Sequence, residues 1–158
     1  MKQSLKTGFS FGLTSGIITT LGLMVGLYSS TGSKLVVLSG IITIAFADSL
    51  SDALGIHVSE ESRKKVSGKH VWTATVSTFV SKFVFAISFI LPVILFDLSL
   101  AIVLSVVYGL SLLSLLSYYI ARTQKKKPWK VIIEHLVIGV CVMFLTNFVG
   151  LFVKTIFG

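Results

Sequence analysis

Residues 35–57 read LVVLSGIITIAFADSLSDALGIH, an apolar run in which Asp48 and Asp52 are the only fully charged side chains. Because an α-helix rises about 1.5 Å per residue, this run forms a helix about 35 Å long. The hydrocarbon layer of a bilayer is about 30 Å thick, so the helix is long enough to cross it. The stretch therefore predicts a membrane-spanning helix with two carboxylates inside the span.

Four further apolar runs of similar length occupy residues 9–29, 71–96, 98–121 and 131–153. Over all 158 residues 54% are apolar, 13% are charged and the mean hydropathy is +0.94. A soluble domain carries about 25% charged residues, and a chain of this size has too little polar sequence to bury five such helices in a core. We therefore expect an all-α integral membrane protein, in which residues 1–158 form a single domain of five transmembrane helices.

Positive charges are distributed unevenly between the two ends of the predicted helices. Two Lys residues flank one end, and eleven basic residues flank the other: Lys2, Lys6, Arg63, Lys64, Lys65, Lys69, Arg122, Lys125, Lys126, Lys127 and Lys130. By the positive-inside rule, the amino terminus is expected in the cytoplasm and the carboxyl terminus outside. This topology accounts for the basic residues, so no nucleic-acid partner is expected. The small size and the basic loops favour a prokaryotic plasma membrane, and the cluster Lys125, Lys126 and Lys127 is a candidate for contact with anionic lipid headgroups.

Three ionisable side chains lie well inside the predicted spans, where each charge costs about 2.5–3.5 kcal/mol near the helix centre. Asp48 and Asp52 are four residues apart, so their carboxylates project from one helix face about one turn apart. Such a pair can bind a hard divalent cation or share a proton. Lys82, in the third run, can instead form a buried ion pair with one of them, and Asp52 can be hydrated at the interface.

Small and polar residues predict contacts between the helices. The first helix has a stripe of glycines that lets a second helix approach closely, from the same chain or from another copy; the stripe comprises Gly8, Gly12, Gly16, Gly22 and Gly26. Asn147, near the middle of the fifth run, is expected to hydrogen-bond to a neighbouring helix. Pro92 is expected to kink the third helix near its end.

The sequence has none of the motifs that are typical of enzymes. It shows no nucleophile paired with a base, no phosphate-binding loop and no Cys/His zinc pattern. Cys141 is the only cysteine, so the chain has no internal disulfide framework. We expect neither an enzymatic activity nor a bound cofactor.

Two stretches resemble the vacuolar iron transporter family, whose members move ferrous iron or manganese. Residues 11–21, FGLTSGIITTL, are similar to that family's opening stretch, in which Asn-Asp-Gly is followed by two apolar residues and Thr-Thr-Leu. Residues 47–59, ADSLSDALGIHVS, are similar to the family's small-residue stretch that leads through Ser-Met to Gly and Tyr-Val-Ser. Residues 72–92 and 138–150 fall in register as well. The resemblance implies a homodimer whose first and second helices line a path at the subunit interface, with metal exchanged for protons.

The chain departs from the family's ligand pattern at three positions. Ser15 stands for the first-helix Asp, Asp52 for the second-helix Met, and Thr43 for a carboxylate of helix two. The family's long acidic cytoplasmic helices are reduced to residues 59–70, so its ligand set is not carried over. The sequence instead predicts Asp48 and Asp52 as metal ligands; the candidates along the pathway are Ser15, Thr19, Thr43 and Lys82.

These patterns together predict a dimeric membrane carrier of ferrous iron or manganese that is coupled to protons. The metal is then a transported substrate and not a resident cofactor. Two alternatives remain open. One is a non-transporting membrane scaffold of the same fold with an internal Asp–Lys ion pair, and the other is a carrier of protons or of other ions.

Overall fold

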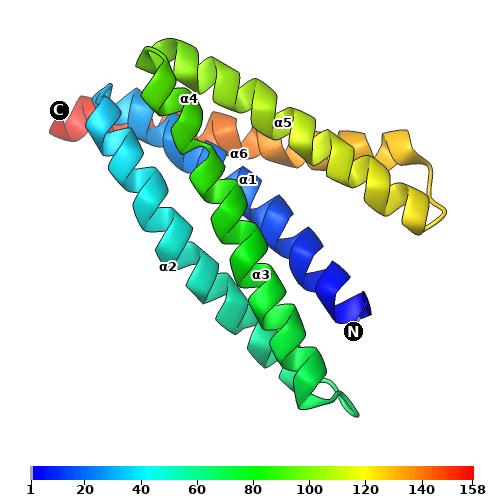
Figure 1. Ribbon diagram of the computed structural model, residues 1–158. Coiled ribbons are helices and arrows are strands. Elements are labelled where there is room, and N and C mark those ends of the chain that lie inside the picture. Colours follow the sequence, from blue (N-terminus) through cyan, green and yellow to red (C-terminus); the bar gives the residue numbers. More distant parts are fainter. Residues whose placement is uncertain (1) are drawn as a thin grey trace.

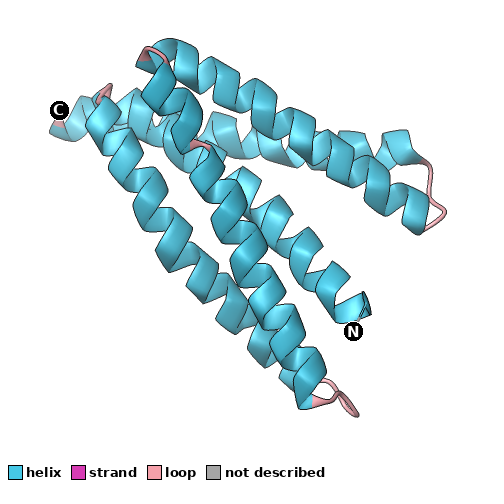
Figure 2. Cartoon of the chain, in the orientation of Figure 1, coloured by secondary structure: helices cyan, strands magenta, loops and turns pink. Residues whose placement is uncertain are grey.

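The computed structural model describes residues 2–158, which are almost entirely helical. Figure 2 shows helices joined by short loops, and the described residues include no strand. In chain order the helices are α1 (Lys2–Thr31), α2 (Lys34–Glu61), α3 (Gly68–Ser88), α4 (Ile90–Leu95), α5 (Leu98–Thr123) and α6 (Pro128–Phe157). Because α3 and α4 together form one span, five segments are long and apolar enough to cross a membrane. The prediction of an all-α fold with five candidate membrane spans is confirmed.

The helices extend beyond the apolar runs from which they were predicted. The last helix, for example, runs from Pro128 to Phe157, whereas its apolar run covers residues 131–153. At the starts of α2 and α3, polar residues remain helical because a serine side chain accepts a hydrogen bond from a backbone N–H of the first turn. The side chain of Ser33 accepts a hydrogen bond from the backbone N–H of Val36 at the start of α2, which satisfies a group that a helix end otherwise leaves free.

The third span is interrupted at Phe89, between α3 and α4. Pro92 follows three residues later; it has no backbone N–H, and its ring clashes with the carbonyl of the residue four positions earlier, Ser88. The helix ends at Ser88, and the backbone N–H of Phe89 donates instead to the carbonyl of Ala86 at 3.3 Å. The kink predicted from Pro92 is therefore confirmed.

The first helix, α1, is the centre of the bundle. It packs against α2, α3, α5 and α6, while α2 pairs with α3 and α5 pairs with α6. In Figure 1 the loop between α2 and α3, the loop between α5 and α6 and the amino terminus lie at one end of the molecule, where the two helix pairs have diverged. This end carries most of the Lys and Arg residues, and we call it the basic end.

The core lies along α1, and the outer faces of the bundle are apolar. Leu13, Ile17 and Leu21 of α1 are buried against neighbouring helices. Many large apolar side chains point outward, including Leu54 of α2 and Phe148 of α6, which are 63% and 64% exposed. Soluble monomers rarely expose apolar surface on this scale. The outer faces therefore suit contact with lipid and support an integral, multi-pass membrane protein.

The first half of the glycine stripe makes a close contact between α1 and α3. Gly8, Gly12 and Gly16 all face α3, and a Cβ placed on Gly16 would lie 3.0 Å from the carbonyl oxygen of Lys82. Only a residue without a side chain lets the two backbones approach this closely. The glycines therefore hold the backbone of Lys82 directly against α1.

The second half of the stripe packs α1 against α6. A Cβ on Gly26 would lie 3.3 Å from the carbonyl oxygen of Thr146. One residue further along α6, the side-chain oxygen of Asn147 accepts a hydrogen bond of 2.5 Å from the hydroxyl of Ser29. The interhelical bond predicted for Asn147 is confirmed, and the glycine contacts lie within one chain.

Candidate functional site: an ion triad in the middle of the spans

Lys82 of α3 pairs with both carboxylates of α2. Its Nζ lies 2.5 Å from Oδ2 of Asp48 and is also in direct contact with Oδ2 of Asp52. The side chain of Lys82 is buried, with only 1% exposed. We call Asp48, Asp52 and Lys82 the ion triad. The sequence left open which carboxylate Lys82 would meet, and the structure shows that it meets both.

The ion triad lies near the middle of the candidate spans. Lys82 is the fifteenth residue of the span Gly68–Leu95, and Asp48 is the fifteenth residue of the span Lys34–Glu61. Because α2 and α3 are neighbours that run in opposite directions, residues at their midpoints lie at the same depth. The spacing of four residues between Asp48 and Asp52 then turns both carboxylates to the same side of α2. A charge at this depth is costly unless it is paired. The ammonium of Lys82 pairs with two carboxylates.

Ser15 of α1 hydrogen-bonds to two members of the ion triad. Its hydroxyl donates to Oδ2 of Asp52 at 2.7 Å and accepts from Nζ of Lys82 at 2.9 Å. The close α1–α3 contact at Gly12 and Gly16 brings this hydroxyl within reach of the ammonium. Three helices therefore contribute to one polar centre.

The two threonine candidates, Thr19 and Thr43, take different positions. Thr19 lies one turn from Ser15, and its hydroxyl donates to the backbone carbonyl of Ser15 at 2.8 Å. Thr43 is exposed on α2. It lies nine residues from Asp52, which is about two and a half helical turns and so places it on the opposite side of the helix. The structure thus brings Ser15 to the ion triad, keeps Thr19 beside it and leaves Thr43 away from it.

The two carboxylates are not sealed inside the protein. The side chain of Asp48 is 28% exposed and that of Asp52 is 23% exposed. Two carboxylates and one ammonium give the ion triad a formal net charge of −1. The centre therefore has a fully buried cation beside two partly exposed carboxylates, although Oδ2 of Asp48 is itself buried.

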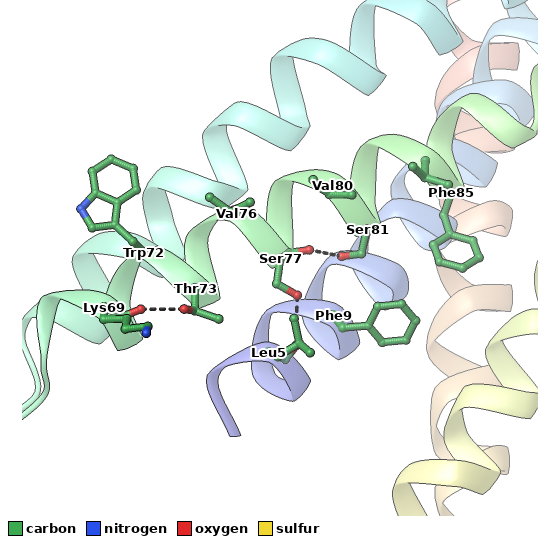
Figure 3. A pocket seen from close by; sticks show the side chains of 11 residues that line it. Leu5, Phe9, Lys69, Trp72, Thr73, Val76, Ser77, Val80, Ser81 and Phe85 are labelled. Carbon is green, nitrogen blue, oxygen red and sulfur yellow. Dashed lines mark hydrogen bonds between the residues drawn. The ribbon is translucent and has the colours of Figure 1, made fainter. Parts of the chain in front are cut away.

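A large cavity on α1 and α3 is a different feature. It is a groove of about 820 Å³ along α1 and α3, shown in Figure 3. Its floor includes the hydroxyl of Ser77, which donates to the carbonyl of Leu5 at 3.0 Å, and its walls include Phe9, Val76 and Val80. None of the ion triad residues lines it. The lining of the groove is mostly apolar, so we do not assign the ion chemistry to it.

A second cluster of charged side chains lies at the loop between α2 and α3, at the basic end. The buried carboxylate of Glu60 accepts hydrogen bonds from Nη1 of Arg63 at 3.0 Å on each oxygen, and Nε2 of His70 lies 3.1 Å away. These contacts fasten the end of α2 to the start of α3. The cluster therefore helps to hold the α2–α3 pair that carries the ion triad.

Ser49 is a polar residue that sequence reasoning missed. It follows Asp48 directly, is fully buried, and its hydroxyl has no hydrogen-bond partner within residues 2–158. A buried hydroxyl is normally satisfied. Its position between the two carboxylates in the sequence is the signal that could have identified it.

The lysines predicted to contact lipid headgroups lie in the loop between α5 and α6. Lys125, Lys126 and Lys127 are all exposed. Lys125 adopts a left-handed backbone conformation with a φ of 56°, and Lys127 is the N-cap of α6. The three side chains therefore remain accessible at the basic end.

The described residues offer few ligands from which a complete metal centre could be built. Within residues 2–158, no group of three or more His, Cys, Asp or Glu side chains is placed to hold a metal ion. Asp48 and Asp52 supply the carboxylates of the ion triad, and Ser15 supplies a hydroxyl. Comparison with known proteins adds no further assignment, since no family model matches the sequence and no curated protein is significantly similar to it.

Proposed function

We propose that this chain is a membrane carrier, and not an enzyme, and that it exchanges a divalent metal cation for protons. Asp48 and Asp52 are the proposed cation ligands. The observation that supports this most is the ion triad, a net negative centre at mid-span whose two carboxylates are partly accessible. Ionisable groups at this depth are costly and typically mark ion pathways.

The charges of the ion triad suggest how the exchange works. A divalent cation between Asp48 and Asp52 neutralises both carboxylates. It also repels the ammonium of Lys82, which lies in direct contact with the same oxygens. Two like charges this close in a low dielectric are unfavourable by several kcal/mol, about 4 kcal/mol at 4 Å for an effective dielectric constant of 20. The cation therefore takes the place of the Lys82 ammonium between the two carboxylates, and we propose that this displacement couples metal entry to proton exit.

The choice of metal follows from the ligand atoms and from the resemblance. Carboxylate and hydroxyl oxygens favour hard cations such as Mn²⁺ over softer ones. The stretches at residues 11–21 and 47–59 resemble the vacuolar iron transporter family, which moves ferrous iron or manganese. We therefore propose Mn²⁺ or Fe²⁺ as the substrate, with the oxygen of Asp52 in place of that family's thioether.

A homodimer is part of this proposal. Mn²⁺ prefers about six oxygen ligands, and one chain offers the carboxylates of Asp48 and Asp52 with the hydroxyl of Ser15. The partly exposed side of the carboxylates leaves room for ligands from a second copy or from water. Light scattering on the purified protein would show twice the mass of one chain, and a monodisperse monomer would contradict this part of the proposal.

Uptake into liposomes tests the proposed function. Purified protein should carry Mn²⁺ into vesicles, and Asp52→Asn should reduce the rate at least about tenfold, because the cation loses one of two charged ligands. Asp97→Asn is the matched control, since Asp97 lies in the loop between α4 and α5, outside the spans. Equal uptake by the Asp52→Asn and Asp97→Asn proteins would refute the role of Asp52. Flux that persists without added metal would instead identify a carrier of protons or other ions.

The burial of Lys82 favours a second candidate function. An ammonium that is 1% exposed and held by two carboxylates and a hydroxyl is a firm structural contact. The same geometry suits a non-transporting scaffold in which the ion triad joins α3 to α2. Absence of metal flux from a folded protein, together with strong energetic coupling among the three side chains, would favour this candidate.

A further inference from the structure

A polar crevice separates α1 from the hairpin of α5 and α6 at the basic end. It consists of two adjoining cavities of about 560 and 390 Å³, which share Ser10, Ile120 and Gln124. In Figure 1 the end of the α5–α6 hairpin lies apart from the amino-terminal part of α1. We call this feature the basic crevice. It lies on a different set of helices from the ion triad.

The charges in the basic crevice favour an anion. Lys6 of α1 lines one of its cavities, and Lys126 of the α5–α6 loop lines the other, while Glu134 is the one carboxylate among the lining residues. No side chain caps the first turn of α6, which begins beside Lys126. Free N–H groups at a helix start attract negative charge. The crevice therefore has one lysine on α1 and one on the α5–α6 loop, an arrangement that suits an anionic ligand.

The crevice is built from fixed side chains on the α5–α6 side. Nδ1 of His135 lies 2.7 Å from the hydroxyl of Ser117, which is fully buried on α5. This contact joins α5 to α6 and holds the imidazole at the wall of the cavity. The hairpin thus presents its polar groups from a defined position.

The apolar part of the lining indicates a lipid. Phe11, Ile120 and Val131 share the crevice with the polar groups. A ligand that fits this lining offers an anionic head to the lysines and an apolar body to these side chains. Free phosphate offers the negative charge but no apolar body.

We propose that the basic crevice binds the phosphate headgroup of an anionic phospholipid. Lys6 and Lys126 pair with the phosphate, and Ser10 and Gln124 offer hydrogen bonds to it. The acyl chains leave the crevice along the apolar side chains of α1 and α6. The site does not depend on the transport proposal, because none of its lining residues belongs to the ion triad.

Thermal unfolding in detergent tests this lipid site. Delipidated protein is heated alone, with phosphatidylglycerol, with phosphatidylcholine, or with inorganic phosphate. Phosphatidylglycerol is expected to raise the unfolding temperature by about 5 °C, because a ligand that binds only the folded state stabilises it. Phosphatidylcholine and inorganic phosphate should produce smaller shifts. An equal shift with inorganic phosphate would contradict the lipid assignment, and an equal shift with phosphatidylcholine would contradict headgroup recognition.

Charge-matched variants distinguish lipid binding in the basic crevice from a general attraction of anionic lipid to the basic end. Lys6→Gln with Lys126→Gln should remove the difference between phosphatidylglycerol and phosphatidylcholine. Lys64→Gln with Lys65→Gln, which removes the same charge from the α2–α3 loop, should retain it. An undiminished difference in the first variant would overturn the proposal. If the first variant fails to fold, native mass spectrometry of the single Lys126→Gln protein provides the same comparison, with loss of bound phosphatidylglycerol expected and full retention contradicting the site.

Discussion

Replacement of Lys82 by methionine is expected to lower the free energy of unfolding by about 3 kcal/mol, because it leaves two carboxylates at mid-span without their counter-charge. The ammonium contacts both Asp48 and Asp52 and also donates to Ser15. Values for buried pairs reach about 5 kcal/mol, and we expect the lower value since about a quarter of each carboxylate is exposed. Denaturant titration in detergent micelles measures the loss.

The control for this prediction is Lys154→Met, at the exposed end of α6, where little change in unfolding free energy is expected. Adding Asp48→Asn and Asp52→Asn to Lys82→Met removes the unpaired charges and should recover part of the lost stability. The comparison reports the coupling within the triad because Lys82 is in direct contact with both carboxylates. A triple variant no more stable than Lys82→Met alone would show that the pairing contributes little.

Gly12→Leu is expected to lower the free energy of unfolding by a similar amount, through packing alone. A Cβ at Gly12 would clash with the hydroxyl oxygen of Ser81 and lie 2.5 Å from the carbonyl oxygen of Thr78. The backbone of α3 cannot rotate away as a side chain can, so α1 and α3 must separate. Overpacking in a core typically costs about 1–3 kcal/mol, and the additional carbons of leucine place this variant at or above the upper value.

Gly55→Leu provides the matched control, since a Cβ there meets nothing within 4 Å. This exposed helical position should accept leucine with unchanged or slightly higher stability. Unfolding temperatures of the two variants, measured side by side in detergent, check the prediction. Equal temperatures would show that the α1–α3 contact tolerates a side chain and does not fix the position of Lys82.

Much of the fold could be predicted from the sequence, because the signals are local. Apolar runs of sufficient length predicted all five candidate spans, and the break before Pro92 follows from the covalent structure of proline. The helix ends were less well predicted. Their polar turns carry no apolar signal, and at some helix starts a cap such as Ser33 stabilises them.

The candidate site was predicted only in part, because it depends on how the helices are rotated about their axes. The cost of charge in a membrane identified Asp48, Asp52 and Lys82 one at a time. That one ammonium meets both carboxylates depends on the register between α2 and α3. The glycine stripe predicted a close contact between helices. Which helices make that contact could not be predicted, because it depends on residues far away in the sequence. The divergence of the helix pairs that opens the basic crevice has no sequence signal either.

Binding of Mn²⁺ to purified protein tests the central claim that a metal cation takes the place of the Lys82 ammonium between Asp48 and Asp52. In isothermal titration calorimetry, Lys82→Met should bind Mn²⁺ about tenfold more tightly than the unaltered protein, because a competing positive charge is gone. Adding Asp52→Asn to this variant should abolish the gain. Equal affinities for the three proteins would contradict the account.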